Sequence, residues 1–379
     1  MSTPLDLSAF RRELHAHPEL AGEERKTAQR ILAVLKALKP DGLLTELGGT
    51  GLLATFGKDE AGPQVMVRCE LDALAIPEVN DFEHRSVIPG KSHKCGHDGH
   101  MAILTGLAEK LSNKRPARGR VHLLYQPAEE NGAGAASVLA DPHMKDRHFD
   151  LVLALHNLPG YPLGSAVVRK GAFTASVNSL VITLQGRTSH AAEPEHGINP
   201  ALAVAEILAG SQALQHNMPE EDGLRVVTVV HLDLGSKDYG ISAGRAEVHL
   251  TVRCWTDAEL RQLEQEVEQL ARTTAGKHKL YVDIRRCFTF QANRNEDAAA
   301  ELVEQAVRST GHALVPRAHP FKWGEDFGLF TARYKGCMFG LGAGEEQPAL
   351  HNPDYDFPDA LIPHGVAIFE AAVRQFLDG

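Results

Sequence analysis

Several segments of this sequence place metal-binding residue types directly after apolar runs. Asp72, the pair Glu129-Glu130 and His156 each follow such a run, and the segment His93-Lys-Cys-Gly-His-Asp-Gly-His lies between the first two. Thiolate, imidazole and carboxylate groups together suit Zn²⁺ and related first-row divalent ions. With a histidine near the C-terminus added, the residue types predict a metal centre formed by Cys95, His97, Glu130, His156 and His351.

Each of these residues also has an ordinary structural interpretation. A Cys-x-His pair is usually a buried thiol beside a surface histidine. Adjacent Glu129 and Glu130 are normally solvated, and Asp72 stands where turn carboxylates are common. These interpretations must all hold independently, whereas one metal site explains every residue, so we favour the site.

The chemistry expected of such a site is hydrolysis of an amide bond. Five ligands exceed the four of a tetrahedral ion and suffice, with water, for two ions that share a ligand. Such ions polarise a carbonyl and lower the pKa of bound water to about 7. Glu129 points away from Glu130 if the segment is extended, so it is predicted to be the general base. Asp72 is predicted to orient a ligating histidine.

The elements that position these residues alternate between strand and helix. The pattern predicts strands at 51–56, 64–69, 120–125 and 151–155, with helices at 8–15, 23–38, 97–111 and 133–139. This alternation is typical of an α/β layer with a largely buried sheet. Ligands of an open α/β sheet bind beyond the carboxyl ends of its strands, so the segments are expected to converge there.

The pattern changes at about Gly171. Strands at 177–184, 224–234, 246–254 and 280–287 and helices at 199–215 and 257–274 give a β-α-β-β-α-β order, which is ferredoxin-like. A helix at 297–309 and a strand near 337–340 return to the α/β pattern. We therefore predict an α/β metal-binding catalytic domain formed by residues 1–170 and 288–379, interrupted by an inserted α+β domain of residues 171–287.

Composition limits the function further. The chain has 379 residues, of which 43% are hydrophobic and 23% charged, as expected of a globular protein with two domains. Its formal net charge of −10 argues against nucleic acid or an anionic membrane as a partner. The five cysteines are scattered, the first residues lack a secretory signal, and no apolar run approaches the roughly 20 residues that cross a bilayer. These features predict a cytoplasmic protein.

Together the segments resemble the aminoacylase and hippurate-hydrolase branch of the zinc exopeptidases. That branch also contains plant indole-acetyl-amino-acid hydrolases and bacterial N-acetyl-diaminopimelate deacetylases. The resemblance is carried by Arg12-Glu-Leu-His-Ala-His-Pro-Glu-Leu, Cys95-Gly-His-Asp-Gly-His, Gln126-Pro-Ala-Glu-Glu, Ser189-His-Ala-Ala, Gly324-Glu-Asp-Phe and Leu350-His-Asn-Pro-Asp-Tyr-Asp-Phe. It implies a zinc-exopeptidase-like domain with a mixed sheet and an inserted lid that dimerises. It also implies the same five ligands, Glu129 as proton acceptor and Asp72 as supporting carboxylate.

Three further residues enter through the resemblance. A histidine matching His190 reaches the active site in such enzymes, often that of the partner subunit, although taken alone His190 would be an exposed turn residue. His190 is predicted to be a catalytic residue and, together with Glu325 and Asp326, to bind substrate.

The chain also departs from its relatives. Glu70 stands where the family usually has Asp, Lys94 replaces a small residue, and Glu195 stands where a histidine is common. The stretch Tyr239-Gly-Ile-Ser-Ala-Gly lacks the usual Asn-x-Ile-Pro pattern. These differences concern substrate preference and lid contacts, because every expected ligand and the base are present.

The predicted function is hydrolysis of N-acyl-L-amino acids, with an N-acetyl or aromatic acyl group, by a homodimer that holds one or two Zn, Mn, Co or Ni ions per subunit. The alternative is an exopeptidase or dipeptidase, because a dipeptide presents the same amide beside a carboxylate. A metal-stabilised binding protein without catalysis is disfavoured, since it would need neither Glu129 nor Asp72. A TIM-barrel amidohydrolase does not fit the β-α-β-β-α-β insert.

Overall fold

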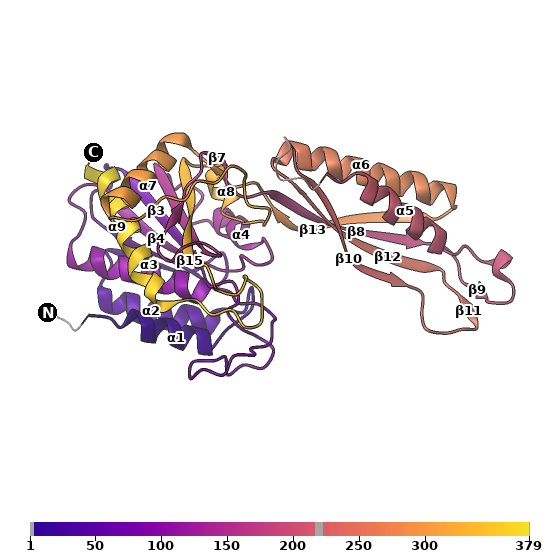
Figure 1. Cartoon of the computed structure of the whole chain (residues 1–379), viewed down its shortest axis with the longest axis horizontal. Coiled ribbons are helices and arrows are strands. Elements are labelled where there is room, and N and C mark those ends of the chain that lie inside the picture. The colour runs from indigo at the N-terminus through magenta and orange to yellow at the C-terminus, as the bar shows by residue number, and fades with distance from the viewer. Residues whose placement is uncertain (1–3, 217–222, 379) are drawn as a thin grey trace. The chain divides into compact units, whose positions relative to one another are not determined.

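The computed structural model describes residues 4–216 and 223–378, which form two compact units (Figure 1). The first unit contains residues 4–173, 293–318 and 326–378, and the second contains the described residues between 174 and 292 together with 319–325. The short segment 319–325, which the sequence pattern places in the catalytic domain, therefore packs with the second unit.

The first unit is built on a seven-stranded mixed sheet with the order β1-β2-β4-β3-β5-β15-β6. The four strands β3, β4, β5 and β15 are parallel, while β1, β2 and β6 pair antiparallel with their neighbours. The strands are β1 (Gly42–Leu47), β2 (Gly51–Phe56), β3 (Gln64–Glu70), β4 (Arg120–Gln126), β5 (Leu151–Pro159), β6 (Ala166–Val167) and β15 (Gly336–Gly344), and a separate ribbon joins β7 (Gly171–Ala172) to β14 (Arg294–Asn295). Parallel pairing brings the carboxyl ends of four strands to one edge of the sheet.

Helices cover this sheet and enclose its core. They are α1 (Leu7–Ala16), α2 (Arg25–Leu38), α3 (His97–Asn113), α4 (Gly134–Ala140), α7 (Asp297–Ser309), α8 (Gly328–Thr331), η2 (Asp359–Leu361) and α9 (Ile362–Asp378). Val67 and Leu123 of the sheet pack in one buried cluster with Ile103 of α3, Val303 of α7 and Phe369 of α9. The parallel strands are nearly continuous apolar runs in the sequence, because a sheet of this kind is buried on both faces. In the part of the chain described, no helix has the length and hydropathy needed to cross a membrane.

The second unit is a four-stranded antiparallel sheet with the order β10-β12-β8-β13 and two helices. Its elements are β8 (Ser176–Gln185), β9 (Ser189–His190), η1 (Pro194–His196), α5 (Ala201–Ala213), β10 (Arg225–Leu234), β11 (Ile241–Ser242), β12 (Arg245–Cys254), α6 (Asp257–Lys277) and β13 (Tyr281–Phe290). Ile207 of α5 and Leu263 of α6 pack against Leu180 and Leu250 of the sheet. The four long strands and two helices follow the ferredoxin-like order, so the predicted fold class is confirmed.

Candidate metal centre

The expected metal ligands come together at the carboxyl edge of the parallel strands, all within the first unit. His156 lies on β5, Cys95 and His97 lie at the start of α3, and Glu130 follows β4. Their side-chain ligand atoms form groups in which all members lie within 4.8 Å of one another. These groups are Cys95, His97 and His156; Cys95, Glu130 and His351; and His97, Glu129 and Glu130.

His97 is oriented towards two carboxylates. Its Nδ1 donates a hydrogen bond to the carbonyl oxygen of Asp72 at 2.8 Å, which turns Nε2 towards Glu129 and Glu130 at 4.0 and 3.9 Å. Nε2 is buried and has no hydrogen-bond partner among the described residues. Burial lowers the pKa of His97, but the Asp72 carboxylate, 3.6 Å from Nδ1, and the charges of Glu70 and Glu130 outweigh it and raise this pKa to about 10. Since buried polar atoms are ordinarily bonded, this nitrogen facing negative charge fits a bound cation.

Cys95 and His156 complete one side of the cluster. The Cys95 Sγ lies 3.5 Å from Nε2 of His156, and Nδ1 of His156 donates to the carbonyl oxygen of Asn157 at 3.0 Å. Burial lowers the pKa of His156 to about 3, which leaves the neutral imidazole that metals bind. Burial, followed by the charges of Glu130 and Glu129, raises the pKa of the Cys95 thiol. A divalent cation would reverse that effect, because coordination deprotonates a thiol.

Glu129 and Glu130 lie in a turn and not in an extended segment. Ala128 has a φ of 52°, and the N–H of Gly132 donates to the carbonyl oxygen of Glu129 at 2.8 Å. Both carboxylates therefore approach His97. Because the segment is not extended, the condition under which Glu129 would point away from Glu130 is not met. The N–H of Glu130 donates to the Asp72 carboxylate at 2.9 Å, so Asp72 supports this turn as well as His97.

His351 reaches the cluster from a loop near the C-terminus. Its Nε2 lies 3.9 Å from the carboxylate of Glu130, while the rest of its side chain is exposed. Its backbone has a φ of 67°, and its N–H donates to the carbonyl oxygen of Lys94 at 2.8 Å. His351 therefore brings a loop near the C-terminus into contact with the residues that precede α3.

Sequence reasoning missed a buried charged network that supports these residues. The Arg68 guanidinium forms ion pairs with Glu70 and Asp326, and Nδ1 of His100 donates to Glu70 at 2.6 Å. Asp326 also accepts hydrogen bonds from Gln126 at 2.8 Å and from the N–H of Ala135 at 2.8 Å. Asp326 was expected to bind substrate, but these donors enclose its fully buried carboxylate, which suits a positioning role.

The other residues that the family resemblance singled out belong to the second unit. His190 is exposed on β9, opposite Ile241 of β11, and its Nδ1 accepts a hydrogen bond from the N–H of Ala192 at 3.0 Å. Glu325 is buried in the same unit. Ile241 belongs to the stretch that departs from the family pattern, so that departure lies directly across the ribbon from His190.

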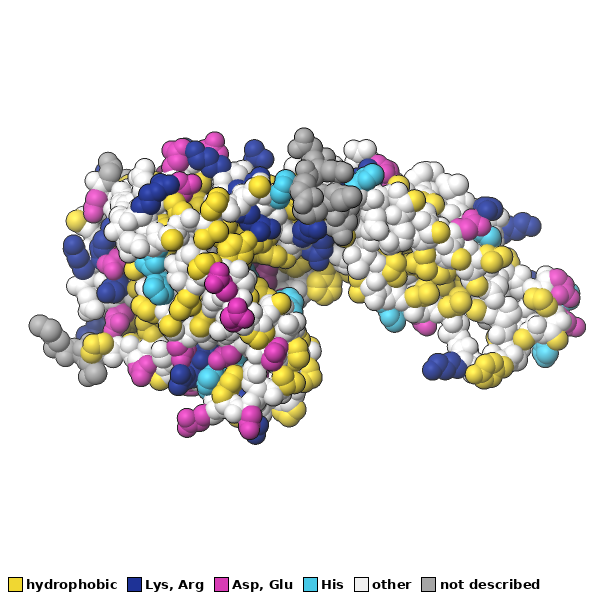
Figure 2. All heavy atoms as spheres, viewed as in Figure 1, with side chains coloured by type: hydrophobic (Ala, Val, Ile, Leu, Met, Phe, Trp, Pro, Cys, Tyr) yellow, Lys and Arg dark blue, Asp and Glu magenta, His cyan; other side chains and the backbone are white. Residues whose placement is uncertain are grey.

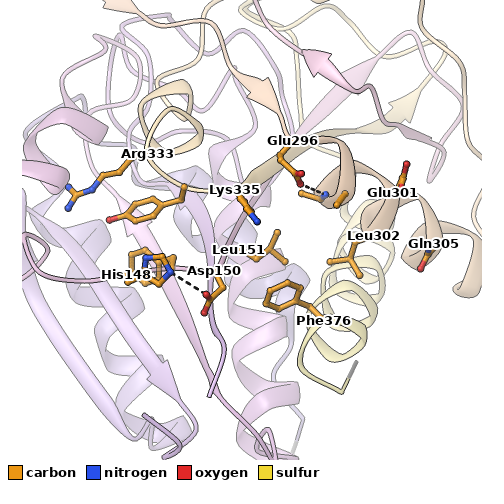
Figure 3. A pocket seen from close by; sticks show the side chains of 14 residues that line it. His148, Asp150, Leu151, Glu296, Glu301, Leu302, Gln305, Arg333, Lys335 and Phe376 are labelled. Carbon is orange, nitrogen blue, oxygen red and sulfur yellow. Dashed lines mark hydrogen bonds and ion pairs between the residues drawn. The ribbon is translucent and has the colours of Figure 1, made fainter. Parts of the chain in front are cut away.

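A separate cavity of about 760 Å³ opens on the first unit at the other edge of its sheet. Leu151 begins β5 and Lys335 immediately precedes β15, so the cavity lies at the amino ends of strands whose carboxyl ends carry the cluster. In Figure 3, Asp150 bonds to His148 and Glu296 caps α7. None of the five expected ligands is among its lining residues. The cavity is therefore separate from the cluster of expected ligands.

Comparison with known proteins gives consistent matches over most of the chain. Residues 66–375 match the model of Peptidase family M20/M25/M40. An N-acetyldiaminopimelate deacetylase of Anoxybacillus flavithermus is 31% identical over 358 residues, which cover 93% of this chain and 94% of the relative. IAA-amino acid hydrolase ILR1-like 2 of Arabidopsis thaliana is 29% identical over 380 residues, which cover 97% of this chain and 84% of the relative. The crystal structure of a Bacillus subtilis protein described as a dinuclear metal binding peptidase from the M20 family has a TM-score of 0.82, with 26% identity and 98% coverage of both chains.

Proposed function

The chain belongs to peptidase family M20/M25/M40 and is a metal-dependent hydrolase of amide bonds, and we propose that its substrates are N-acyl-L-amino acids. The resemblance expected from the sequence motifs is confirmed by the family match. Hydrolysis would release the free amino acid and a carboxylic acid. The preferred substrates would carry an N-acetyl or an aromatic acyl group. The deacetylase and the IAA-amino acid hydrolase among the relatives support this class of substrate.

One observation carries the proposal, namely the buried Nε2 of His97 facing Glu129 and Glu130 inside the cluster. We propose that one or two divalent ions, chosen from Zn, Mn, Co and Ni, are held by Cys95, His97, Glu130, His156 and His351. Such ions supply Lewis acidity, which polarises an amide carbonyl and lowers the pKa of water.

The protein's own groups would then move the protons. We assign Glu129 as the general base, which takes a proton from the attacking water and returns it to the leaving nitrogen. Its carboxylate lies 4.0 Å from Nε2 of His97, beside the ligands. Asp72 would keep His97 and Glu130 aligned through its carbonyl oxygen and its carboxylate.

We also propose that the second unit is a lid that pairs two subunits in a homodimer. Its strand β10 lies at the edge of the described sheet and exposes Val229, Val230, Leu232 and Leu234. Figure 2 shows hydrophobic side chains gathered on the surface of this unit. An edge strand with exposed apolar side chains is a ready site for pairing with a second copy. His190 would serve the active site of the partner subunit, where a histidine can stabilise a developing oxyanion.

The alternative is an exopeptidase or dipeptidase, and a substrate panel separates the two. The purified enzyme, supplied with Zn²⁺, Mn²⁺ or Co²⁺, would be offered N-acetyl-, N-benzoyl- and indole-acetyl-amino acids beside dipeptides with the same C-terminal residue. Release of the free amino acid gives kcat/KM for each. Acyl amino acids are expected to be preferred by at least about tenfold, which corresponds to 1.4 kcal/mol. A tenfold preference for dipeptides would establish the alternative.

A further inference from the structure

A lysine side chain is completely buried beside the expected metal ligands. Lys94 directly precedes Cys95, and no part of its side chain is exposed. Its ammonium group forms an ion pair with Glu78 and donates a hydrogen bond to the carbonyl oxygen of Tyr355 at 2.7 Å. An ammonium group taken out of water is stable only when it is paired and hydrogen-bonded. The position of Lys94 is therefore closely specified.

Lys94 holds the loop that carries His351 at two points. The Lys94 carbonyl oxygen accepts the N–H of His351 at 2.8 Å, and its ammonium group bonds Tyr355 four residues further along. The segment 351–355 is therefore fixed at both ends by one residue. Nearby, the Asn80 side chain donates to the carbonyl oxygen of Asp354 at 3.1 Å, which joins the same two loops once more.

The partner of the ammonium group is itself held in place. The second carboxylate oxygen of Glu78 faces Nε2 of His15 at 2.9 Å, and Nδ1 of His15 faces Asp98 at 2.9 Å. Arg11, which lies on α1 together with His15, donates a hydrogen bond to Asp98 at 3.1 Å. Burial raises the pKa of Glu78, but His15 and Lys94 outweigh it and lower this pKa to about 2. Glu78 is thus a fixed, charged anchor for the ammonium group.

His351 needs such support more than the other ligands do. It is exposed, whereas Cys95, His97 and His156 are buried. Its φ of 67° lies in the left-handed region, which a residue with a side chain occupies only when its surroundings impose it. Backbone preference does not place His351 and its own side chain is exposed, so its position depends on the contacts at 351 and 355, together with the buried ring of Tyr355.

We propose that Lys94 is a positioning residue that fixes His351 through the segment 351–355 and thereby tightens metal binding by Cys95, Glu130 and His351. The inference rests on the proposed function, because it requires these residues to bind a divalent ion.

The test compares Lys94→Met with two control variants. Lys91→Met removes an exposed ion pair with Glu23 from the same loop, and Val307→Ala lowers stability in α7, a helix that contributes no ligand. The dissociation constants of Zn²⁺ and Co²⁺ are measured by competition with a chromophoric chelator, and the visible spectrum of the Co²⁺ protein is recorded. Lys94→Met is expected to bind the metal 10–100-fold more weakly, as is typical when a group behind a ligand is lost, and to change the Co²⁺ spectrum. Both controls are expected to match the wild type.

A second variant covers the case in which Lys94→Met does not fold because Glu78 is left buried without its cation. Lys94→Met/Glu78→Gln removes both charges, and it is expected to fold and still to bind the metal weakly, because Tyr355 has lost its ammonium donor. Wild-type affinity and an unchanged Co²⁺ spectrum, in either folded variant, would overturn the inference. A wild-type protein that binds no divalent ion would instead contradict the proposed function itself.

Discussion

The carbonyl oxygen of Asp72 lies 2.8 Å from Nδ1 of His97, closer than the Asp72 carboxylate at 3.6 Å, so the main chain makes the hydrogen bond that orients this ring. The carboxylate instead accepts the N–H of Glu130 at 2.9 Å. One residue thus aligns a histidine on α3 with the turn that follows β4. A substitution of the Asp72 side chain can therefore remove the hydrogen bond from Glu130 while the main-chain hydrogen bond from His97 remains.

Asp72→Ala is therefore expected to weaken metal binding through Glu130. We expect the dissociation constant of Zn²⁺ to rise 10–100-fold, within the range found for groups that support a ligand. Asp72→Asn keeps an oxygen that can accept from Glu130, so its loss should be smaller. Competition with a chelator measures both constants. Equal losses in the two variants would count against this assignment.

Glu129→Gln is expected to keep its metal and to lose about 10²–10⁴-fold in kcat, the usual contribution of a general base. The amide retains the shape of the side chain but accepts no proton. Elemental analysis and turnover of an N-acyl amino acid are measured on the same preparation. A metal-replete variant with wild-type turnover would exclude Glu129 as the base.

The sequence was sufficient for most of the fold because long apolar runs and periodic helices carry strong local signals. Helix α7 and strand β2 have the predicted bounds. Strand β1 escaped prediction, since Glu46 has a φ of 61° and the register shifts between Leu44 and Leu47, which breaks the alternation of faces. Helix α9 was also missed, although the spacing of Ile362, Val366, Phe369 and Val373 was a usable signal.

The site was less predictable, because its supporting contacts join distant segments. Residue types and strand ends suffice to choose the expected ligands, but the ion pair of Arg68 with Asp326 spans 258 positions of the chain. The direction of Glu129 depends on the left-handed backbone of Ala128, which is rare for a residue with a side chain. No local sequence pattern predicts the Arg68–Asp326 ion pair or the backbone conformation of Ala128.

Removal of the metal is expected to abolish activity and to lower the melting temperature. The proposed ligands come from four separate segments, so only the folded chain brings them together. Binding would stabilise the fold by about 2.7 kcal/mol at a free metal concentration of 100 times the dissociation constant. Chelated protein should regain activity and stability with Zn²⁺, Mn²⁺ or Co²⁺. Full activity in protein shown to be free of transition metal would contradict the prediction.

His15 is expected to make stability depend on pH in the alkaline range. Burial lowers the pKa of His15, but Asp98 and Glu78 outweigh it and raise the pKa from 6.5 to about 9. The groups that face the ring are Asp98, Glu78, Asp356, His84, His93 and Phe82. Because the folded pKa is raised, the contribution is complete below pH 6.5 and is lost as pH rises through about 9.

Urea unfolding of the wild type and His15→Gln at pH 6.5 and 9.5 measures this contribution. The glutamine bears no charge at either pH, so the difference in unfolding free energy between the two proteins should shrink at the higher pH. A difference that does not change with pH would show that His15 acts through packing alone.

The last prediction concerns His190, which is exposed on a short ribbon of the second unit. If His190 serves the partner's active site, His190→Ala should lower kcat without loss of metal, because every proposed ligand lies in the first unit. An exposed turn histidine without function would instead give wild-type kinetics. Ile241→Ala, directly across the ribbon, is the matched control for disturbance of this segment.

Subunit mixing decides whether His190 acts on its own subunit or on the partner. Each hybrid dimer of His190→Ala with Glu129→Gln would contain one site with both an intact base and an intact histidine. Random exchange should then restore about a quarter of the wild-type sites, since half of the dimers are hybrids and half of their sites are complete. Labelled subunits establish that exchange has occurred. Exchanged mixtures that stay inactive would place His190 in its own subunit's site, because complementation requires that the two residues come from different chains.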